Sequence, residues 1–207
     1  MSQLDHIVIA SPDLAALVAE FRTLTGVEPV TGGRHEGRGT ANHLVGLGEG
    51  RYIELIGPDP TQQDVREPRP LRVDEVTGTT VVGWAVRPDD LAAQVASSRE
   101  AGYDPGEPAP MDRTASDGGV IAWRLTPPAG GMGGTVPFLI DWQDSTHPSV
   151  GLPAVTLLSL TITHPDPAAV RAAVAAVGGL EVVTDIRQGP VGLAVEVETP
   201  NGQIRIG

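Results

Sequence analysis

Hydrophobic and polar positions recur in the same order in three segments of the chain. Each segment begins with a run of β-branched and apolar residues, passes through a Pro or Asp turn into an Ala-rich stretch, and reaches a glycine. The segments are LDHIVIASPDLAALVAEFRTLTG, VVGWAVRPDDLAAQVASSREAG and LLSLTITHPDPAAVRAAVAAVGG. An apolar or alternating run is typical of a strand, and Asp before an Ala-rich stretch is typical of a helix N-cap. The pattern therefore predicts a strand followed by a helix in each segment.

The spacing of the turns indicates one unit repeated three times. Asp13, Asp90 and Asp166 stand at almost equal intervals, and so do the glycines after the Ala-rich stretches, which we expect to cap the helices at their C-terminal ends. Further strand-like runs follow each helix, among them RYIELIG, TVPFLIDW and QIRIG. We therefore predict three βαβββ units. Their helices are expected over residues 13–25, 90–101 and 166–177.

Two segments rich in Pro and polar residues divide the chain between the units. They are DPTQQDVREPRPLRVDEVTG and QDSTHPSVGLP, and their composition is typical of loops. The predicted units cover residues 1–58, 78–143 and 152–207. Largely antiparallel strands with helices on their outer face make the fold class α+β, and leave the other face of the sheet free to line a cavity.

Composition narrows the chemistry that such a cavity can hold. The chain has 207 residues, of which 40% are hydrophobic, and it has no cysteine. Any metal site must therefore use His, Asp, Glu or water, and the lack of cysteine fits a cytosolic protein. The formal net charge of −12 and the scattered basic residues argue against a nucleic-acid partner. The first residues resemble neither a signal peptide nor a membrane span, so we expect a cytoplasmic protein that does not enter membranes.

The first unit resembles glyoxalase-like members of the vicinal oxygen chelate superfamily, which also includes bleomycin-resistance proteins and extradiol dioxygenases. The resemblance lies in LDHIVIASPDL, GGRHEGRGTANHLVGLG and GRYIELIG. It implies that two units pair into a curved, bowl-shaped, mostly antiparallel sheet, and that a divalent metal, where present, is held by the first and fourth strands. By this resemblance His6 and Glu54 are metal ligands. It also places Asp141, in VPFLIDW, at or next to the position that matches Glu54.

The second and third units follow the pattern less closely. Gly83 stands opposite His6 in the second unit, and Ser159 does so in the third, whose last strand also lacks a carboxylate. The second unit is therefore expected to pair with the first without supplying a first-strand ligand. The third is expected to be degenerate and structural, bracing the sheet.

Strand alternation independently supports His6 and Glu54 as site residues. If Ile7 and Ile9 pack under the first helix, His6 faces the cavity, and Tyr52 and Glu54 share one face of their strand. A carboxylate within YIELI is costly to bury unless a cation, a hydrogen-bond donor or water accompanies it. The alternative is a structural ion pair between Glu54 and a nearby Arg.

Residues after the first helix add candidates for substrate binding. His35 and Arg38 lie in GGRHEGRGT, whose glycines predict a mobile or sharply folded loop. The resemblance favours a pocket role for His35, and for Thr40 and Asn42, which share a face of the next strand. The alternative for His35 is that it lies in a solvated turn. Together with Tyr52, these are the predicted substrate-binding residues.

A functional metal site needs a third protein ligand besides His6 and Glu54. We favour His35 over Asp141, because the glycine-rich loop can bend inward, and we expect either Glu54 or Asp141 to move a proton. Zn, Mn, Ni and Fe are all compatible with imidazole and carboxylate ligands. His147 follows the last strand of the second unit, and we interpret it as a satisfied loop residue rather than as part of the cavity rim.

Two functions therefore stay open. The first is a glyoxalase-like enzyme for small molecules, in which a metal holds two neighbouring oxygen atoms of the substrate; isomerase, lyase and dioxygenase reactions all suit such a site. The second is a metal-free protein of the bleomycin-resistance type that binds or sequesters a small molecule. No GxSxG, HExxH or dinucleotide-binding motif favours another enzyme class. The expected partner is a small molecule in both cases, and a homodimer stays open.

Overall fold

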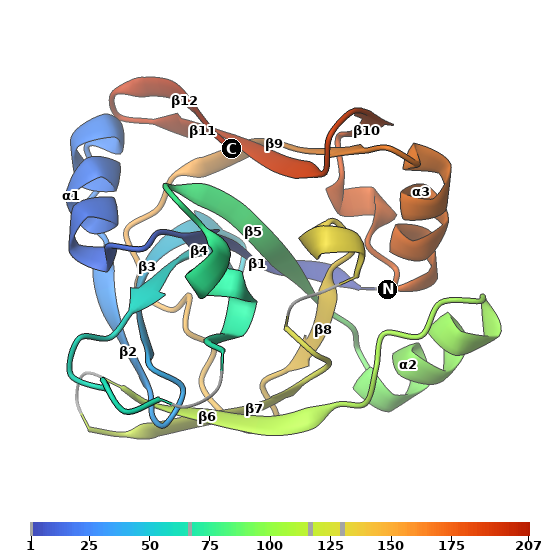
Figure 1. The fold of residues 1–207 in the computed structure, drawn as a ribbon, viewed down its shortest axis with the longest axis horizontal. Coiled ribbons are helices and arrows are strands. Elements are labelled where there is room, and N and C mark those ends of the chain that lie inside the picture. Colours follow the sequence, from blue (N-terminus) through green and yellow to red (C-terminus); the bar gives the residue numbers. More distant parts are fainter. Residues whose placement is uncertain (1, 66–67, 116–117, 129–130) are drawn as a thin grey trace.

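The first two predicted units together form a closed barrel of eight strands (Figure 1). The computed structural model describes residues 2–65, 68–115, 118–128 and 131–207, and element counts refer to those residues. The first unit consists of β1 (Gln3–Ala10), α1 (Leu14–Thr25), β2 (Val30–His35), β3 (Thr40–Gly48) and β4 (Arg51–Pro58). The second consists of β5 (Thr80–Arg87), α2 (Leu91–Glu100), β6 (Ala109–Ala115), β7 (Val120–Leu125), the 3₁₀ helix η2 (Met132–Gly134) and β8 (Phe138–Asp141).

The rest of the chain forms a separate sheet of four strands against the barrel (Figure 1). Its elements are β9 (Thr156–His164), α3 (Pro167–Ala176), the 3₁₀ helix η3 (Leu180–Val182), β10 (Asp185–Gln188), β11 (Gly192–Thr199) and β12 (Gly202–Ile206). The strand order is β10-β9-β11-β12. The fold is therefore a mixed α+β structure dominated by strands. None of the described helices is long and apolar enough to cross a membrane.

The barrel differs from the open bowl that the resemblance implied. Its strand order is β1-β4-β3-β2-β6-β7-β8-β5, with β5 returning to β1; β1 pairs with β4 and β5 with β8 in parallel, and the other pairs are antiparallel. One seam, between β1 and β5, runs along both strands, whereas the other joins only Gly33 and Arg34 of β2 to β6. A side chain on Gly33 would overlap the carbonyl oxygen of Thr114, so glycine is what lets β2 approach β6. This second seam closes the sheet.

Alternating residues of the strands face two different apolar clusters. Ile7 and Ile9 pack in the outer cluster with Leu17 and Phe21 of α1 and with the apolar side chains of the separate sheet. Val8 and its alternate neighbours belong to the inner cluster, which fills the barrel. The predicted assignment of faces on β1 is confirmed, and it follows from the period of two that side chains have along a strand.

The three helices begin where the sequence predicts. The side chains of Asp13, Asp90 and Asp166 each accept a hydrogen bond from the backbone N–H three residues later, at 2.9, 3.0 and 2.9 Å. Gly26 is the C-cap of α1 with φ of 72°. In α2 and α3 the corresponding glycine follows the C-cap residue, because these two helices end one position earlier.

The segment between the first two units lies across the barrel rather than apart from it. It contains the 3₁₀ helix η1 (Pro70–Glu75), which stands in front of the strands in Figure 1. Leu71 is buried among the inner apolar residues. The side chain of Arg69 donates to the carbonyl of Gly39 at 2.9 Å, and Arg72 donates to the carbonyl of Gly133 at 3.1 Å. The predicted linker therefore covers one end of the barrel.

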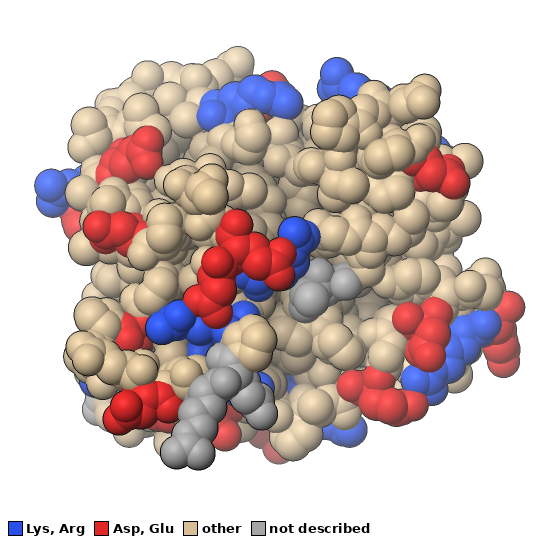
Figure 2. Space-filling view, in the orientation of Figure 1, with Lys and Arg blue, Asp and Glu red and all other residues tan. Residues whose placement is uncertain are grey.

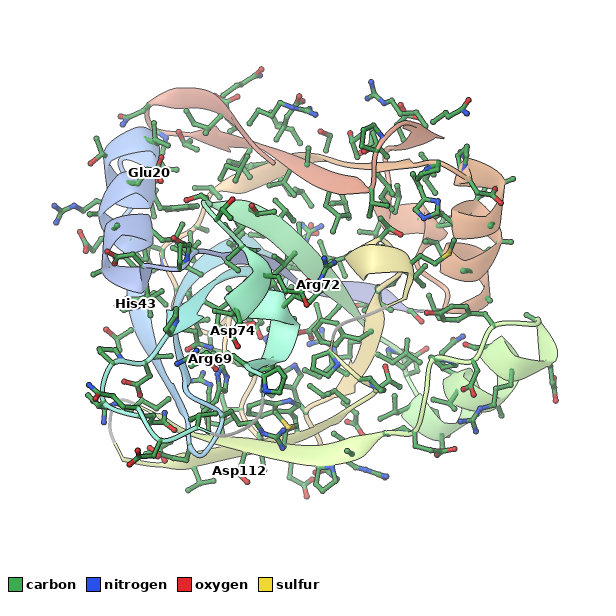
Figure 3. All side chains as sticks on the ribbon, viewed as in Figure 1. Glu20, His43, Arg69, Arg72, Asp74 and Asp112 are labelled. Atoms are coloured by element: carbon green, nitrogen blue, oxygen red, sulfur yellow. The ribbon has the colours of Figure 1, made fainter. Side chains whose placement is uncertain are left out.

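The outer side of η1 is charged. Arg69 pairs with Asp74 at 2.6 Å and Arg72 pairs with Glu75 at 2.8 Å. Figure 3 shows Arg69, Arg72 and Asp74 at this short helix, and acidic and basic groups gather over it in the centre of Figure 2. Because these pairs are largely exposed, they place charged groups on the solvent side of η1 and contribute little to stability.

Candidate functional site

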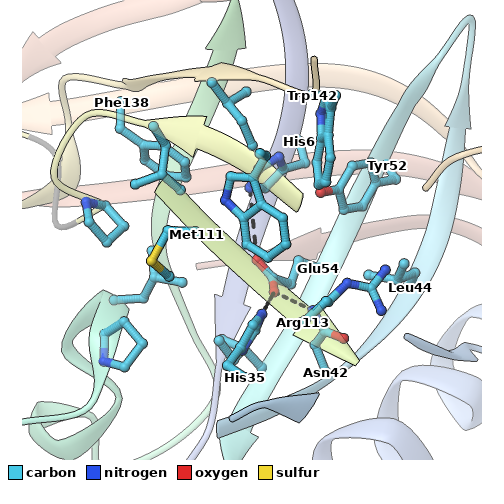
Figure 4. A pocket seen from close by; sticks show the side chains of 17 residues that line it. His6, His35, Asn42, Leu44, Tyr52, Glu54, Met111, Arg113, Phe138 and Trp142 are labelled. Atoms are coloured by element: carbon cyan, nitrogen blue, oxygen red, sulfur yellow. Dashed lines mark hydrogen bonds and ion pairs between the residues drawn. The ribbon is translucent and has the colours of Figure 1, made fainter. Parts of the chain in front are cut away.

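A cavity of about 40 Å³ lies inside the barrel, between the inner apolar residues and η1 (Figure 4). That volume holds a few water-sized groups, but the cavity is not enclosed, so a larger ligand can extend out of it. Both units of the barrel line it, and Pro70 and Leu71 of η1 border it. Its polar lining residues are His6, His35, Asn42, Tyr52, Glu54 and Arg113.

Glu54 stands at the centre of the polar side chains (Figure 4). Its side chain is 8% exposed. Oε1 accepts a hydrogen bond from Nδ2 of Asn42 at 2.6 Å. His6 and His35 approach the two carboxylate oxygens separately: Nε2 of His6 is 3.8 Å from Oε2, and Nε2 of His35 is 3.9 Å from Oε1. His6, Asn42 and Glu54 therefore lie together on one face of the three strands that carry them.

Strand register explains why these side chains meet. In the parallel β1–β4 pair His6 stands beside Tyr52, two positions before Glu54, and in the antiparallel β3–β4 pair Asn42 stands beside Ile56, two positions after it. Residues two apart share a face, so all of them point into the barrel. His35 ends β2 and is paired with the first residue of β3, which closes a tight hairpin rather than a mobile loop.

Asp5 fixes the orientation of His6. The register between β1 and β5 shifts at this point, as in a β-bulge, and such shifts redirect side chains. Oδ1 of Asp5 lies 2.7 Å from Nδ1 of His6. Because an ionised carboxylate only accepts hydrogen bonds, Nδ1 carries the proton, and Nε2 presents a lone pair to Glu54 when the imidazole is neutral.

The other oxygen of Asp5 is held by three more groups. Oδ2 accepts from Nε1 of Trp142 at 3.0 Å, from Arg87 at 3.2 Å and from Nε2 of His147 at 3.0 Å. Burial by itself raises the pKa of Asp5, but the hydrogen bonds from His147 and His6 outweigh it and hold that pKa far below its usual value. Asp5 is therefore an ionised, fully buried carboxylate.

His35 is held in a similar way by a neutral partner. Its Nδ1 lies 2.9 Å from Oγ1 of Thr40. Burial lowers the pKa of His35, Glu54 opposes that shift, and Arg113 and Arg38 reinforce it. At neutral pH the ring is therefore an uncharged imidazole whose Nε2 faces Glu54.

Aromatic residues are concentrated around this cavity. The chain has three Trp, two Tyr and two Phe, and Trp123, Trp142, Tyr52 and Phe138 all line it. The His6 ring stacks on Tyr52 with centroids 4.7 Å apart and meets Phe138 edge-on at 5.4 Å. Flat apolar walls of this kind suit a planar ligand.

The structure brings five of the predicted site residues to the cavity and leaves three outside. His6, His35, Asn42, Tyr52 and Glu54 line it. Thr40 lies behind His35, and Arg38 is exposed in the hairpin turn.

The structure corrects the predicted site at Asp141, which lies outside the cavity. Its neighbour Ile140 lines the cavity, so Asp141 faces the other side of β8, where its carboxylate accepts from the backbone N–H of Gln143 at 2.8 Å. A register assigned one residue off accounts for the difference, because it exchanges the two faces of a strand. The structure gives Asp141 no contact with Glu54 or the histidines.

Several residues of the site carry no signal in the sequence. Arg113 and Trp123 lie on β6 and β7, where the sequence offers no motif, and in VPFLIDW only Asp141 was singled out, not Trp142. Asp5 was detectable only as the neighbour of His6. The sequence led us to interpret His147 as a loop residue whose hydrogen bonds are satisfied. Its two ring nitrogens do bond Asp5 and Ser149. The ring also packs against Tyr52 and Trp142 beside the cavity.

The predicted metal ligands fit an ion in kind but not in spacing. Two imidazoles and a carboxylate are suitable donors for Zn, Mn, Ni or Fe. Metal-binding histidines also engage their second nitrogen with a carboxylate or similar acceptor, as His6 does. However, across residues 2–65, 68–115, 118–128 and 131–207 no three His, Asp or Glu side chains are grouped closely enough to hold an ion. The side chains as placed do not form a metal centre.

The fold and the site together define an α+β barrel protein with a polar cluster inside an aromatic cavity. The family model described as a glyoxalase-like domain matches residues 4–178. The chain therefore belongs to the glyoxalase-like domain family, within the vicinal oxygen chelate superfamily. No curated protein matches the chain.

Solved structures resemble this chain at low sequence identity. A hypothetical protein from Staphylococcus aureus is 14% identical with a TM-score of 0.69, and the match covers 100% of this chain and 99% of that one. The similarity therefore includes the separate four-stranded sheet. Methylmalonyl-CoA epimerase from Mycobacterium tuberculosis is 20% identical, with 66% and 84% of the two chains covered and a TM-score of 0.40. That from Streptomyces coelicolor, in complex with 2-nitronate-propionyl-CoA, is 22% identical, with 74% and 99% covered and a TM-score of 0.41.

Proposed function

We propose that this protein is an enzyme that transfers a proton on a small, oxygen-containing substrate held inside the barrel. Glu54 is the group that takes the proton, and His6 and His35 contact the neighbouring oxygen atoms. One observation carries the proposal: the Nε2 atoms of two histidines face a buried carboxylate at 3.8 and 3.9 Å, too far for a direct hydrogen bond.

The physical argument rests on what must lie between these groups. Asp5 fixes the His6 tautomer, so a neutral His6 turns a lone pair towards an acceptor oxygen of Glu54. Two acceptors facing each other in a buried site repel unless a proton donor or a cation separates them. A substrate with a hydroxyl group, or with an acidic C–H next to a carbonyl, supplies the missing donor. The substrate thereby completes the network.

The reaction that follows is a proton transfer. Glu54 removes a proton from the carbon next to a carbonyl; the electron pair of the broken C–H bond forms a C=C bond, and the C=O π pair moves onto the carbonyl oxygen to give an enolate. In a hydroxycarbonyl substrate this species is an enediolate, and an isomer forms when the hydroxyl proton moves to the oxygen that gained the charge and Glu54 returns its proton to the former carbonyl carbon. In a substrate with a leaving group on the next carbon, expelling that group as an anion gives a lyase product. Both outcomes share the first step, so the proposal commits to that step.

A divalent metal ion is the second candidate occupant of the same space. The donor types of His6, His35 and Glu54 favour it, together with the engaged Nδ1 atoms of both rings. A bound ion would act as a Lewis acid on two neighbouring substrate oxygens. No step of the proton transfer above depends on it.

The test is hydrogen–deuterium exchange on a panel of small hydroxyketones and dicarbonyl compounds, followed by proton NMR in D₂O. We expect the wild type to accelerate exchange of at least one compound and Glu54→Gln to lower that rate by about 10²–10⁴-fold. Glu49→Gln is the control, because Glu49 is exposed at the β3–β4 turn. Metal content and calorimetric titration with Zn, Mn, Ni and Fe(II) test the second candidate on the same samples.

The outcomes separate the alternatives. No exchange with any compound, or equal rates in the wild type and Glu54→Gln, contradicts the enzyme proposal. A compound that binds to the wild type but is never exchanged favours the metal-free binding protein of the bleomycin-resistance type.

We also infer that the chain is built from three copies of one βαβββ unit, over residues 1–58, 78–143 and 152–207. The same element order and the same Asp cap in each part support this. The described residues that line the cavity all precede residue 143, so the third copy serves the structure rather than the site.

A further inference from the structure

Arg113 is a buried cation in the wall of the cavity. It lies on β6, is 4% exposed, and donates a hydrogen bond from its guanidinium to the carbonyl of Gly32. In the described part of the chain no carboxylate forms an ion pair with it, and Glu54 acts on it only at longer range. A guanidinium has five N–H donors and stays protonated in proteins. Burying such a charge with so few acceptors is unfavourable unless an anionic partner accompanies it.

Trp123 offers a second unsatisfied donor beside it. Its indole N–H is buried and has no hydrogen-bond acceptor among the described residues. Trp123 is paired with Met111 across the β6–β7 ladder, two positions from Arg113, so the two side chains are diagonal neighbours on one face. Both line the cavity.

The cavity is therefore divided into two walls of opposite character. The first unit supplies the carboxylate of Glu54 and the lone pair that a neutral His6 ring carries on Nε2. The second unit supplies the donors of Arg113 and Trp123. An anionic group on a ligand is repelled by Glu54 and attracted by Arg113, so charge alone fixes which end of the ligand lies at which wall.

We propose that the substrate is a compact, planar organic acid whose carboxylate binds Arg113, with the indole N–H of Trp123 as an additional donor. A carboxylate matches the two parallel N–H groups of a guanidinium, which favours it over an uncharged group. The aromatic walls of Tyr52, Phe138 and Trp142 accommodate a flat body. In this orientation the end of the molecule away from the carboxylate lies at Glu54. The binding claim stands independently, and only the identity of the reacting end rests on the proposed proton transfer.

The experiment compares benzoate with benzamide, which has the same shape and no charge, by calorimetry and by tryptophan fluorescence. We expect benzoate to bind the wild type at least about tenfold more tightly than benzamide, and Arg113→Gln to remove that preference. Trp123→Phe should weaken benzoate several-fold. Arg124→Gln is the matched control, since Arg124 is exposed on the next strand and should leave both ligands unaffected.

A second variant guards against loss of folding. Arg113→Lys keeps the charge but lacks the fork of N–H groups, so benzoate should bind it more weakly than the wild type and still more tightly than benzamide does. Circular dichroism checks the fold of each variant. Equal affinity for the two probes, unchanged benzoate binding in a folded Arg113 variant, or no binding of either probe to the wild type overturns the proposal.

The two proposals fail separately. Glu54→Gln should bind benzoate at least as tightly as the wild type, because it removes the like charge from the opposite wall. Benzoate binding without any proton exchange would leave the anion site standing and contradict the proton-transfer function. Proton exchange with uncharged carbonyl compounds only would support the proton-transfer function and contradict the anion site.

Discussion

Asp5 ties the cavity to segments that are distant in the sequence. Its carboxylate joins His6 of β1, Arg87 at the end of β5, and Trp142 and His147 after β8. Each of these groups needs an acceptor in a place that water hardly reaches. One buried carboxylate satisfies all four, so its contribution is expected to exceed that of any single pair.

Removing the charge of Asp5 should therefore cost both stability and function. We expect Asp5→Asn to lower the free energy of unfolding by about 2–4 kcal/mol in urea denaturation, since it leaves Arg87 without its buried partner. The His6 tautomer is also released, so proton exchange should slow. Asp185→Asn is the control, because Asp185 forms an exposed pair with Arg187. Equal losses in the two variants would show that Asp5 has no special role.

The lowered pKa of His35 predicts a pH dependence of stability. The fold favours the neutral ring, so this contribution is complete above the ordinary value of 6.5 and is lost as the pH falls below it. We expect the free energy of unfolding to fall between pH 7.5 and 5.5, with a slope from this group of at most about 1.4 kcal/mol per pH unit. The measurement is urea denaturation with EDTA present, so that metal ions do not interfere.

The variant comparison isolates His35 from other titrating groups. His35→Gln should show a flatter pH profile than the wild type, because it removes the titrating ring whose neutral form the fold favours. Parallel profiles for the wild type and His35→Gln would contradict the assignment.

At the scale of residues, local pattern predicts which side chains share a face but not what stands opposite them. His6, Asn42 and Glu54 can be assigned because side chains two positions apart on a strand share a face, so each strand shows which neighbours accompany them. Arg113 comes from a strand, APMDRTA, in which no apolar alternation marks an inner face. Its place in the cavity depends on the pairing of β6 with β2 across the barrel seam, which no local pattern encodes.

Elements show the same division between local and distant information. The helices were predictable because a cap, an Ala-rich stretch and a glycine are all local signals. Closure into a barrel was not, because it needs the contact of β2 with β6, which are far apart in sequence. The position of η1 was missed for a related reason: Pro and charge predict an irregular segment, but not that Leu71 turns into the barrel.

The shared cap predicts a common response of the three helices. Replacing Asp13, Asp90 or Asp166 with Ala should each lower the free energy of unfolding by about 1 kcal/mol, because one backbone N–H of the first turn loses its acceptor. Asn at the same position keeps an acceptor oxygen and should restore most of the loss. Thermal denaturation of the three Ala and Asn pairs measures this. An Asn variant as unstable as its Ala partner would show that the cap does not act through this hydrogen bond.

Over the whole molecule, the separate sheet completes a core that the barrel alone leaves exposed. Leu160, Ile162 and Val195 pack in one cluster with Ile7 and Trp84 on the outside of the barrel. β1 and β5 thus have an inner face towards the cavity and an outer face towards this sheet, and they are apolar on both. The cavity wall and the third part of the chain therefore share the same two strands.

Gly179 is a tight point of this contact and gives the corresponding prediction. A Cβ added there would lie 2.9 Å from the ring of Trp84 and 3.3 Å from Pro137, both fixed in the core. Gly179→Ala should therefore lower the free energy of unfolding by about 1–3 kcal/mol through overpacking, as measured by urea denaturation. Gly78→Ala is the control, since a Cβ at that glycine meets nothing within 4 Å and its backbone suits alanine. If the third part of the chain were only loosely attached, Trp84 would move aside and both variants would be as stable as the wild type. A selective loss in Gly179→Ala would instead mean that barrel and sheet unfold as one body, so that damage to the outer contact is transmitted to the strands that carry His6 and Asp5.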